Sequence, residues 1–427
     1  MAIVAVSLFT LAFALIASER VNRVVAVLLG VAAMSVVGIV DTHTAFFSEE
    51  TGVDWNVIFL LFGMMMVVSV TKQTGLFEYL AIWAAKRSGG RPFRLMVMLV
   101  VVTALISAFL DSVTVMLLVA PVTFAVCGRL ALPPVPFVLA EVFAANIGGT
   151  ATLIGDPPNI MIGLRAGLSF DDFLVNLAPI TVVLLLVFLG LCRIMFRSAL
   201  QYHPERVAAM MAMDEDAALK DRAGVVKCLA VIGLVIVGFV LHTRLGLEPS
   251  VIAMLGAGLI VLVNRSSAAE FLEEVEWETL VFFMGLFVLV GGLVHTGVID
   301  AVGKAAIDVV GDRYLLAAGG LMAGSTIIGG IIDTIPFVAT MLPIVEEFGA
   351  SIGDAGTREA LWWALALGAD LGGNATAVGA SANVVAIGVA RSQGHPISFW
   401  TFTKYGIVVA GVTVPLAFAY VWLRYFL

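Results

Sequence analysis

Apolar segments long enough to cross a membrane follow one another from end to end of this chain. In order, they cover 2–17, 22–40, 54–73, 94–126, 135–166 and 173–197, and then 223–243, 247–264, 277–295, 314–348, 360–390 and 402–426. A helix needs about 20 apolar residues to span the hydrocarbon core of a bilayer. Apolar residues make up 61% of the 427 and charged residues 13%, whereas soluble domains are about half apolar and a quarter charged. The sequence therefore predicts an all-α membrane protein with many spans.

The two halves of the chain share a sequence pattern. Asp111 matches Asp333 at an offset of 222, and Asn159 matches Asn383 at an offset of 224. The string at 148–152 also matches the string at 372–376 at the second offset. Matches in one register over more than a hundred residues indicate an internal duplication. We predict a first copy at 1–197 and a second at 223–427, joined by a polar cytoplasmic linker at 198–222.

Each copy is predicted to contain five transmembrane spans plus one re-entrant hairpin. The segments 94–126 and 314–348 are too long for one span and too short for two, and each has a polar break at its middle, at Asp111 and at Asp333. Irregular backbone at membrane depth is tolerated where protein or a cavity surrounds it. Because the number of spans is odd, the second copy would be inverted, with an unwound helix from each copy at the midplane.

This organisation predicts the same three parts in both copies. In the first copy, 1–93 forms a scaffold, 94–166 the hairpin and broken helix, and 173–197 the last span. The corresponding parts of the second copy are 223–313, 314–390 and 402–426.

The distribution of charge predicts the orientation. If the loop with Arg20 and Arg23 is cytoplasmic, alternation of the spans places most Lys and Arg residues on that side, and the acidic loop around Glu49 on the other. This agrees with the positive-inside rule. We therefore expect a multi-pass protein of the cell (inner) membrane with both termini outside, Arg87 and Arg206 in the cytoplasm, and Asp308 outside.

The hairpin tips hold the leading candidates for a binding site. Ionisable groups within spans are costly and mark ion or substrate pathways. Carboxylates beside hydroxyls and free carbonyls suit a hard cation or a proton. The predicted tip residues are Asp111, Ser112, Thr114, Asp333 and Thr334. The structural alternative is that each Asp caps the helix that follows it.

A second group of candidates lies where glycines and prolines break two apolar segments. A break frees backbone amides and carbonyls, and the ends of half-helices bind ions and substrates in transporters. The predicted residues are Asn146, Gly148, Gly149, Thr150, Thr152, Asp156 and Asn159 in the first copy, and Asp370, Gly372, Gly373, Asn374, Thr376, Ser381 and Asn383 in the second. A kink used for packing is the structural alternative.

Two acids near the breaks are candidate proton carriers. Glu141 and Asp370 could carry protons or pair with a basic residue. Cys127, Cys192 and Cys228 lie far apart in sequence, which argues against a disulfide framework or a zinc site. The chain has no P-loop, no nucleophile–base constellation and no basic nucleic-acid face, so we expect neither an enzyme nor a cofactor. The expected coupling ion is H⁺ or Na⁺.

Several strings resemble one known group of transporters. IGGTATLIGDPPNIMIG (147–163), SAFLDSVTVMLLVAPVT (107–123), WNVIFLLFGMMMVV (55–68) and GIIDTIPFVATMLPIV (330–345) are similar to the arsenite permease and P-protein group of the ion transporter superfamily, which also includes sodium/proton antiporters of the NhaD type and divalent-anion/sodium symporters. The resemblance implies about ten spans, two opposed hairpins, two unwound helices around a midplane site, a homodimer and elevator-like movement.

The hairpin tips depart from the pattern of that group. Its carboxylate symporters have a Ser-Asn-Thr string at each tip, and its arsenite permeases and P proteins more often have Asp-Asn. This chain has Asp111-Ser112 and Asp333-Thr334 instead, which leaves the substrate and the coupling ion open. Two aspartates disfavour a dianion, since like charges repel unless cations intervene.

The leading hypothesis is export of arsenite or antimonite in exchange for protons. The alternatives among transporters are a sodium/proton antiporter and sodium-coupled uptake of a carboxylate such as citrate or a dicarboxylate. A channel, or the membrane subunit of a pump driven by a separate ATPase, is the alternative from another class. The expected partners are the lipid bilayer, a small ion and a second copy of the chain.

Overall fold

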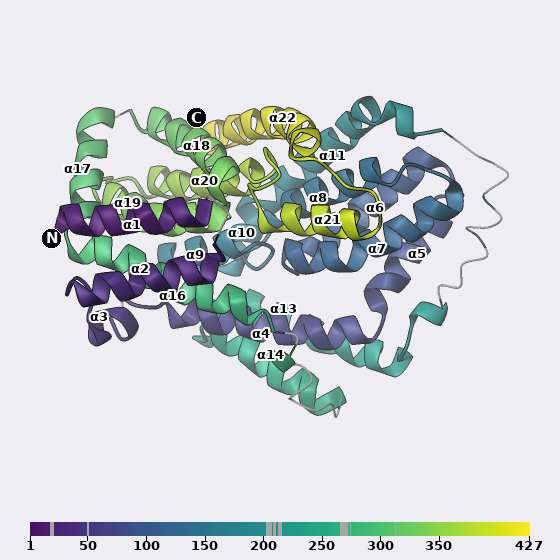
Figure 1. The fold of residues 1–427 in the computed structure, drawn as a ribbon, viewed down its shortest axis with the longest axis horizontal. Coiled ribbons are helices and arrows are strands. Elements are labelled where there is room, and N and C mark those ends of the chain that lie inside the picture. Colours follow the sequence, from purple (N-terminus) through teal and green to yellow (C-terminus); the bar gives the residue numbers. More distant parts are fainter. Residues whose placement is uncertain are drawn as a thin grey trace.

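The computed structural model describes all residues except 18–20, 49–50, 202–206, 208–210, 212–215, 265–271, 274 and 312. The described residues form helices joined by turns and contain no strand (Figure 1). The predicted all-α class is therefore confirmed. Arg20, Glu49 and Arg206, which the predicted orientation used, lie outside the described residues.

The helices of the first half lie close to the predicted apolar segments. They are α1 (Ala2–Ala17), α2 (Arg23–Val36), α3 (Thr42–Phe46), α4 (Trp55–Gln73), α5 (Leu76–Arg87), α6 (Pro92–Ser107), α7 (Ser112–Leu130), α8 (Val135–Gly149), α9 (Pro157–Ala166), α10 (Phe170–Asn176) and α11 (Ala178–Met195). Between the halves, short 3₁₀ turns cover Arg197–Ala199 and Asp216–Ala218.

The helices of the second half repeat much of this order. They are α13 (Arg222–Leu245), α14 (Pro249–Asn264), α16 (Trp277–His295), α17 (Val298–Val310), α18 (Tyr314–Ile332), α19 (Thr334–Ala350), α20 (Ala355–Gly372), α21 (Ser381–Ser392) and α22 (Phe399–Tyr425).

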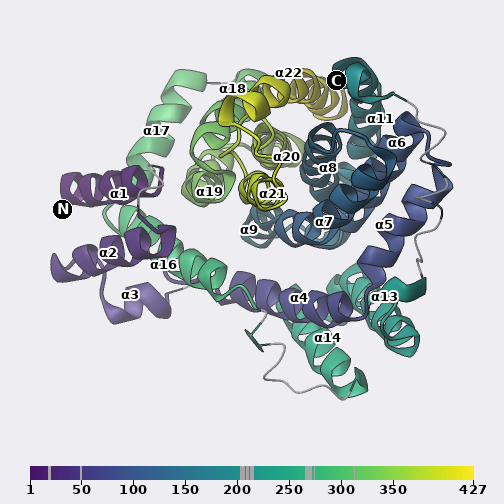
Figure 2. The same ribbon diagram turned by 45° about the vertical axis from the view of Figure 1, so that its right-hand side comes forward.

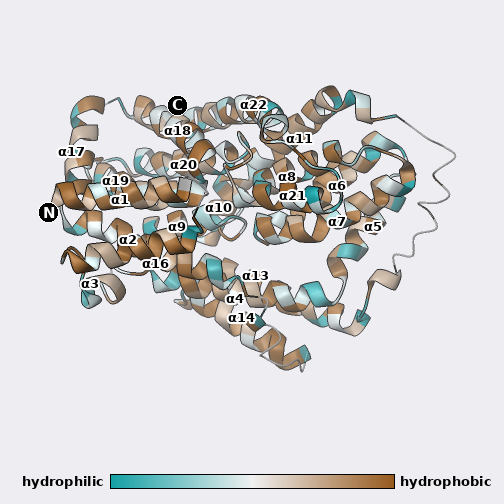
Figure 3. Ribbon diagram, viewed as in Figure 1, coloured by the Kyte–Doolittle hydropathy of each residue, from teal (hydrophilic) through white to brown (hydrophobic). Residues whose placement is uncertain are grey.

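Seven of the described helices are long and apolar enough to cross a membrane: α4, α7, α11, α13, α16, α18 and α22. Other apolar helices, including α1 and α2, have fewer than 18 residues; α1 covers the whole predicted segment 2–17, and α2 is shorter than the predicted 22–40. Large apolar side chains remain exposed on the outside, such as Leu186 (64%), Leu262 (74%) and Ile327 (62%), and apolar residues dominate the helical part of the molecule (Figure 3). A surface of this kind suits lipid rather than water.

The helices form an outer arc and an inner bundle (Figure 2). The outer arc comprises α1, α2, α4, α5, α13, α14, α16 and α17, which fall within 1–93 and 222–313. The inner bundle comprises α6–α9, α11 and α18–α22. Within the arc, α14 packs on α4 and α16 on α2, while in the bundle α6 packs on α8 and α18 on α20. The arc is formed by residues of the predicted scaffold, and the division of each copy into these parts stays a prediction.

Two helical hairpins enter the bundle from opposite ends. The first joins α6 to α7 just before Asp111, and the second joins α18 to α19 at Asp333. Figure 1 shows α18 and α19 toward the end of the molecule that holds the N-terminus, and α6 and α7 toward the other end. This is the arrangement expected from an inverted duplication, which itself stays a prediction.

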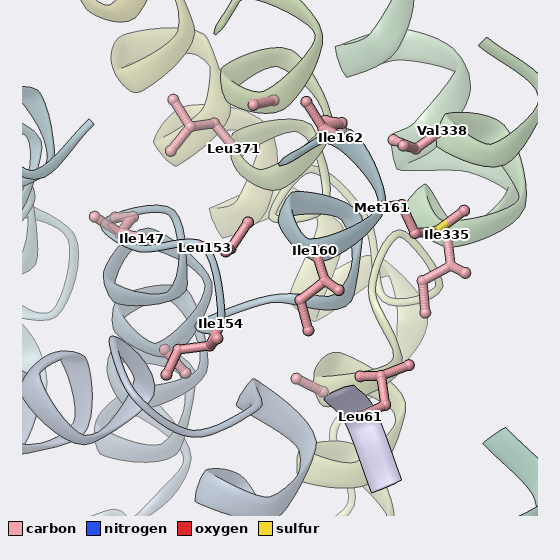
Figure 4. Packing of buried hydrophobic residues seen from close by; sticks show 14 of the residues in the cluster. Leu61, Ile147, Leu153, Ile154, Ile160, Met161, Ile162, Ile335, Val338 and Leu371 are labelled. Carbon is pink, nitrogen blue, oxygen red and sulfur yellow. The ribbon is translucent and has the colours of Figure 1, made fainter. Parts of the chain in front are cut away.

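Two helices are interrupted inside the bundle. The first break separates α8 from α9 and the second separates α20 from α21. Figure 4 shows apolar side chains around the first break, among them Leu153 and Ile154 of the break itself and Ile160 of α9. Leu153 is fully buried and Ile154 is 5% exposed. The freed backbone groups therefore lie in a packed protein interior, which is the environment that makes them tolerable in a membrane.

Candidate functional site

A central cavity of about 380 Å³ lies between the outer arc and the inner bundle. The arc contributes Asn22 and Arg23 at the start of α2, and the α16 residues Glu278, Thr279 and Phe282 together with Glu276 just before that helix. The bundle contributes both hairpin tips, including Asp111 and Asp333, and Ser381 at the start of α21. Both predicted tip aspartates therefore face one cavity, although they are more than two hundred residues apart in sequence.

Asp111 caps the helix that follows it. Its Oδ1 accepts a hydrogen bond from the amide of Thr114 at 2.9 Å, which is the usual geometry of an N-cap. Ser112 is buried, and its hydroxyl lies 3.1 Å from that of Ser107 at the end of α6. Asp111 therefore acts as a helix cap, as the structural alternative predicted, and it also lines the cavity.

Asp333 has a different backbone conformation from its repeat mate. Its φ is +122°, a region that residues other than glycine rarely adopt, whereas φ of Asp111 is −59°. Its Oδ1 accepts from the amide of Ile335 at 3.1 Å, and its Oδ2 accepts from the hydroxyl of Ser381 at 3.3 Å. Such strain costs about 1–3 kcal/mol and often accompanies a functional site.

Arg23 brings a positive charge to this tip. Its guanidinium donates to Oγ of Ser381 at 3.1 Å and to Oγ1 of Thr279 at 3.4 Å, and it lies over the ring of Phe282. Arg23, Ser381 and Asp333 therefore form a chain of polar contacts from the arc to the bundle. The sequence pattern predicts Arg23 in a loop and does not indicate this role. A positive charge at the start of the apolar segment 22–40 was its only signal.

The threonines of the breaks attach each break to the hairpin of its own copy. Thr152 donates to the carbonyl of Ala108, and Thr376 donates to that of Gly330. The two pairs are repeat-related, so the same contact occurs twice. Thr334, the first residue of α19, is buried behind its tip.

The glycines at the breaks allow close packing of helices. A Cβ on Gly148 would lie 2.3 Å from the carbonyl oxygen of Ala104 in α6, and one on Gly372 would lie 2.5 Å from Cα of Thr326 in α18. A Cβ on Gly149 would meet the carbonyl of Gly155 at 2.9 Å, and one on Gly373 would meet Cβ of Ala380 at 3.2 Å. These positions support the packing alternative; a direct part in binding stays a prediction.

Four buried asparagines make hydrogen bonds at the two breaks, and three of them are joined to one another in a network. Asn159 donates to the carbonyls of Gly149 and Thr152 at 3.4 and 3.2 Å, and Asn383 donates to those of Gly373 and Thr376 at 2.8 Å each. Asn146 joins the copies by donating to Oδ1 of Asn374 at 2.9 Å and to Oδ1 of Asn383 at 3.1 Å. This network lies behind the cavity rather than in its wall.

The remaining predicted acids occupy different places. Asp370, at the end of α20, is 2% exposed and lies beside Thr150 and Asn159. Asp156 precedes α9 without a capping hydrogen bond from its side chain. Glu141 is fully buried in α8, where its Oε1 accepts from Thr123 at 2.5 Å, and it does not line the cavity. The structure therefore brings Asp370 to the breaks and places Glu141 apart from the tips.

No metal site forms among the described residues: no group of three or more His, Cys, Asp or Glu side chains has a suitable arrangement there. The three cysteines are buried free thiols.

A family model described as "Citrate transporter" matches residues 13–368 of this chain. An uncharacterized transporter of Mycobacterium bovis is 51% identical over 426 residues and covers 100% of this chain and 99% of its own. The P protein of the mouse is 32% identical over 494 residues, covering 97% of this chain but 59% of its own. This similarity confirms the predicted resemblance to the P-protein group.

One solved structure resembles the fold over most of its length. The YdaH transporter of Alcanivorax borkumensis, described as having an unusual topology, matches with a TM-score of 0.58 at 15% identity. The match covers 86% of this chain and 84% of that one. At this level of identity the similarity concerns the fold alone.

Proposed function

Because this chain belongs to the citrate transporter family and is a multi-pass membrane transporter, we propose that it is a secondary transporter of the cell membrane that binds a small solute in the central cavity. In this proposal the inner bundle moves against the outer arc and exposes the cavity to each side in turn. The position of the cavity between these two groups of helices supports alternating access. The solute crosses without chemical change.

The charge of the cavity wall is the observation that carries the proposal for the substrate. Among the described lining residues, the acids are Asp111, Glu276, Glu278 and Asp333, and the one strong base is Arg23. A surplus of carboxylates repels a free multiply charged anion, whereas it accepts a neutral hydroxide or a cation. We therefore take arsenous or antimonous acid as the leading substrate, exported in exchange for protons that bind at Asp111 and Asp333.

A growth assay tests the substrate. An arsenite-sensitive bacterial strain that expresses the protein should grow at arsenite concentrations that stop the vector control. Membrane abundance must be measured in the same cells. Equal growth of the two strains, with the protein present in the membrane, would exclude arsenite export.

Arg23 favours a second candidate, which is cation-coupled transport of a carboxylate such as citrate. A guanidinium presents a fork of donors that matches a carboxylate, and Arg23 already faces Ser381 in the cavity wall. Such a substrate would need bound cations to offset the four lining acids. The name of the matching family model also points to citrate.

Purified protein in liposomes separates these candidates. Labelled arsenite, citrate and succinate would be offered under an imposed pH gradient and, separately, under a sodium gradient. Arsenite flux driven by the pH gradient supports the first candidate, and citrate flux driven by sodium supports the second. Sodium-driven proton movement without a solute would identify a sodium/proton antiporter.

Counterflow tests the channel alternative. Unlabelled substrate inside the liposomes accelerates entry of labelled substrate through a carrier, whereas an open pore shows no such acceleration. Transport by the purified chain without ATP would also exclude an obligatory ATPase partner.

A further inference from the structure

One pair of repeat-related positions differs in chemistry although the neighbours of the two residues lie at corresponding positions. Asn146 near the end of α8 corresponds to Asp370 near the end of α20 at the offset of 224. The neighbours of Asn146 are Asn374 and Asn383, and those of Asp370 are Thr150 and Asn159. The second pair of neighbours lies at the same offset from the first. One copy therefore has an amide where the other has a carboxyl group.

On the amide side of this pair, both amide hydrogens of Asn383 and of Asn146 are donated. Asn383 donates both of its amide hydrogens to the carbonyls of Gly373 and Thr376 at 2.8 Å each. This fixes its Oδ1 toward Asn146, because the reverse orientation would bring oxygen against two carbonyl oxygens. Asn146 then donates its two hydrogens to the Oδ1 atoms of Asn374 and Asn383.

On the carboxyl side of the pair, the two neighbours of Asp370 present hydrogen-bond acceptors to it. Asn159 is oriented in the same way as Asn383, since its Nδ2 donates to two carbonyls; its Oδ1 has no hydrogen-bond partner among the described residues. Thr150 has a single hydrogen, which it donates to the carbonyl of Asn146 at 3.0 Å. Both neighbours can therefore only accept from Asp370.

Asp370 itself has no donor. Both of its oxygens are buried and lack hydrogen-bond partners among the described residues, and the residue is 2% exposed. An ionised carboxylate can only accept hydrogen bonds. Ionisation would thus bring three or more acceptor atoms together away from water, which is costly.

We propose that Asp370 is a proton-binding site, separate from the hairpin tips, in which the bound proton is donated to Oδ1 of Asn159 or to Oγ1 of Thr150. The proton reproduces in the second copy the contact that Nδ2 of Asn146 makes in the first. It joins the broken helix of one copy to that of the other.

The surroundings favour a proton over a metal cation. Neither Asp370 nor Asn159 lines either of the two described cavities, whereas a proton needs no additional space. The charged group that interacts with Asp370 is another carboxylate, Asp156 before α9, which also interacts with Asp111 and Asp333. A negative charge on Asp156 opposes ionisation of Asp370, since like charges repel.

Infrared spectroscopy of the purified protein in detergent tests the proposal directly. The wild type should show, at neutral pH, a carboxylic-acid carbonyl band that is lost in Asp370→Asn. This variant should fold, because its amide can donate to Asn159 and Thr150 as Asn146 does to their counterparts. Thr150→Val keeps the acid and removes one acceptor, so its band should shift rather than disappear. A spectrum unchanged in both variants would overturn the proposal.

Unfolding provides a second measurement that does not depend on transport. Heating exposes the three buried cysteines, so a thiol-reactive dye reports the midpoint. Because the folded state holds a proton that the unfolded state releases at neutral pH, the wild-type midpoint should fall as pH rises. The slope should be smaller in Asp370→Asn and unchanged in the control Asp354→Asn, which alters an exposed helix cap.

Two results would contradict the proton. Equal slopes in wild type and Asp370→Asn would show that Asp370 does not titrate with unfolding. The second result is a midpoint at high pH that rises with NaCl but not with choline chloride. If Asp370→Asn abolishes that rise, the site binds a sodium ion instead. Neither result depends on which solute the cavity carries, so the transport proposal stands or fails separately.

Discussion

The two tip aspartates differ in backbone but share a cavity, and their substitution by asparagine separates binding from capping. Asn caps helices as well as Asp does and tolerates positive φ, so Asp111→Asn and Asp333→Asn should both reach the membrane at wild-type abundance. Losing a charged hydrogen-bonding partner costs about 1.5–3 kcal/mol. We therefore expect transport to fall by roughly tenfold or more and to lose its dependence on pH.

Initial rates measured against pH in liposomes, at matched protein amounts, check this expectation. Asp354→Asn is the control, because it replaces an exposed N-cap whose carboxyl hydrogen-bonds to Thr357. Those hydrogen bonds, first from the side chain of Thr357, hold the pKa of Asp354 below its usual range, so it stays ionised throughout. If both tip variants keep the wild-type rate and pH profile, Asp111 and Asp333 serve as caps and nothing more.

At the level of single residues, the sequence predicted the identity of cavity residues better than their arrangement. Asp111 and Asp333 were found because a charge within an apolar segment is costly and therefore rare. The positive φ of Asp333 was not predictable, since the repeat implies two equal tips. Arg23 was missed because its nearest cavity partners, Thr279 and Ser381, lie more than two hundred residues away in sequence.

Among the elements, the broken helices depend on glycines that touch the hairpin arms. A methyl group on Gly148 would meet the carbonyl oxygen of Ala104 at 2.3 Å, so Gly148→Ala must push α8 away from α6. Overpacking of this kind costs about 1–3 kcal/mol. Gly128→Ala is the matched control: this glycine also lies in a helix, a Cβ there meets nothing within 4 Å, and the substitution should stabilise α7 by roughly 0.5–1 kcal/mol.

Thermal unfolding of the purified variants, followed by dye labelling of the buried cysteines, measures both effects. The midpoint should fall for Gly148→Ala and stay level or rise for Gly128→Ala. A similar decrease in both variants would mean that glycine flexibility in the helices, and not close approach to α6, determines the stability of the bundle.

The boundaries of most elements followed from the sequence, and the exceptions have a physical cause. Apolar runs, N-cap residues and prolines fix α4, α7, α16 and α22 close to the predicted segments. The predicted segment 22–40 corresponds to a shorter helix, α2 (Arg23–Val36), whereas α1 covers all of 2–17; apolar length alone does not fix where a helix ends. The asparagine network could not be predicted from the sequence, because the hydrogen bonds of Asn146 join residues of the two halves. The same reason applies to the contacts of Arg23.

For the whole molecule, the central prediction is that the two copies have opposite orientations in the membrane. Helices α5 and α17 are counterparts at the offset of 222, and each begins after a glycine with positive φ, Gly75 at +79° and Gly297 at +72°. They lie at opposite ends of the molecule in Figure 1. In an inverted duplication, the exposed residues Arg87 of α5 and Asp308 of α17 face opposite sides of the membrane, with Arg87 in the cytoplasm.

Cysteine labelling in intact cells tests this orientation, and the chain suits the assay because its own three cysteines are buried. An impermeant thiol reagent should label Asp308→Cys from outside and should label Arg87→Cys after the cells are opened. Each variant serves as the control for the other, since both cysteines would lie on exposed helix surfaces. Labelling of both from the same side would show parallel copies, and labelling of Arg87→Cys alone from outside would reverse the predicted orientation while keeping the inversion. Opposite sides are also what alternating access requires here, because two hairpins that reach one cavity from opposite faces can expose it to each side in turn.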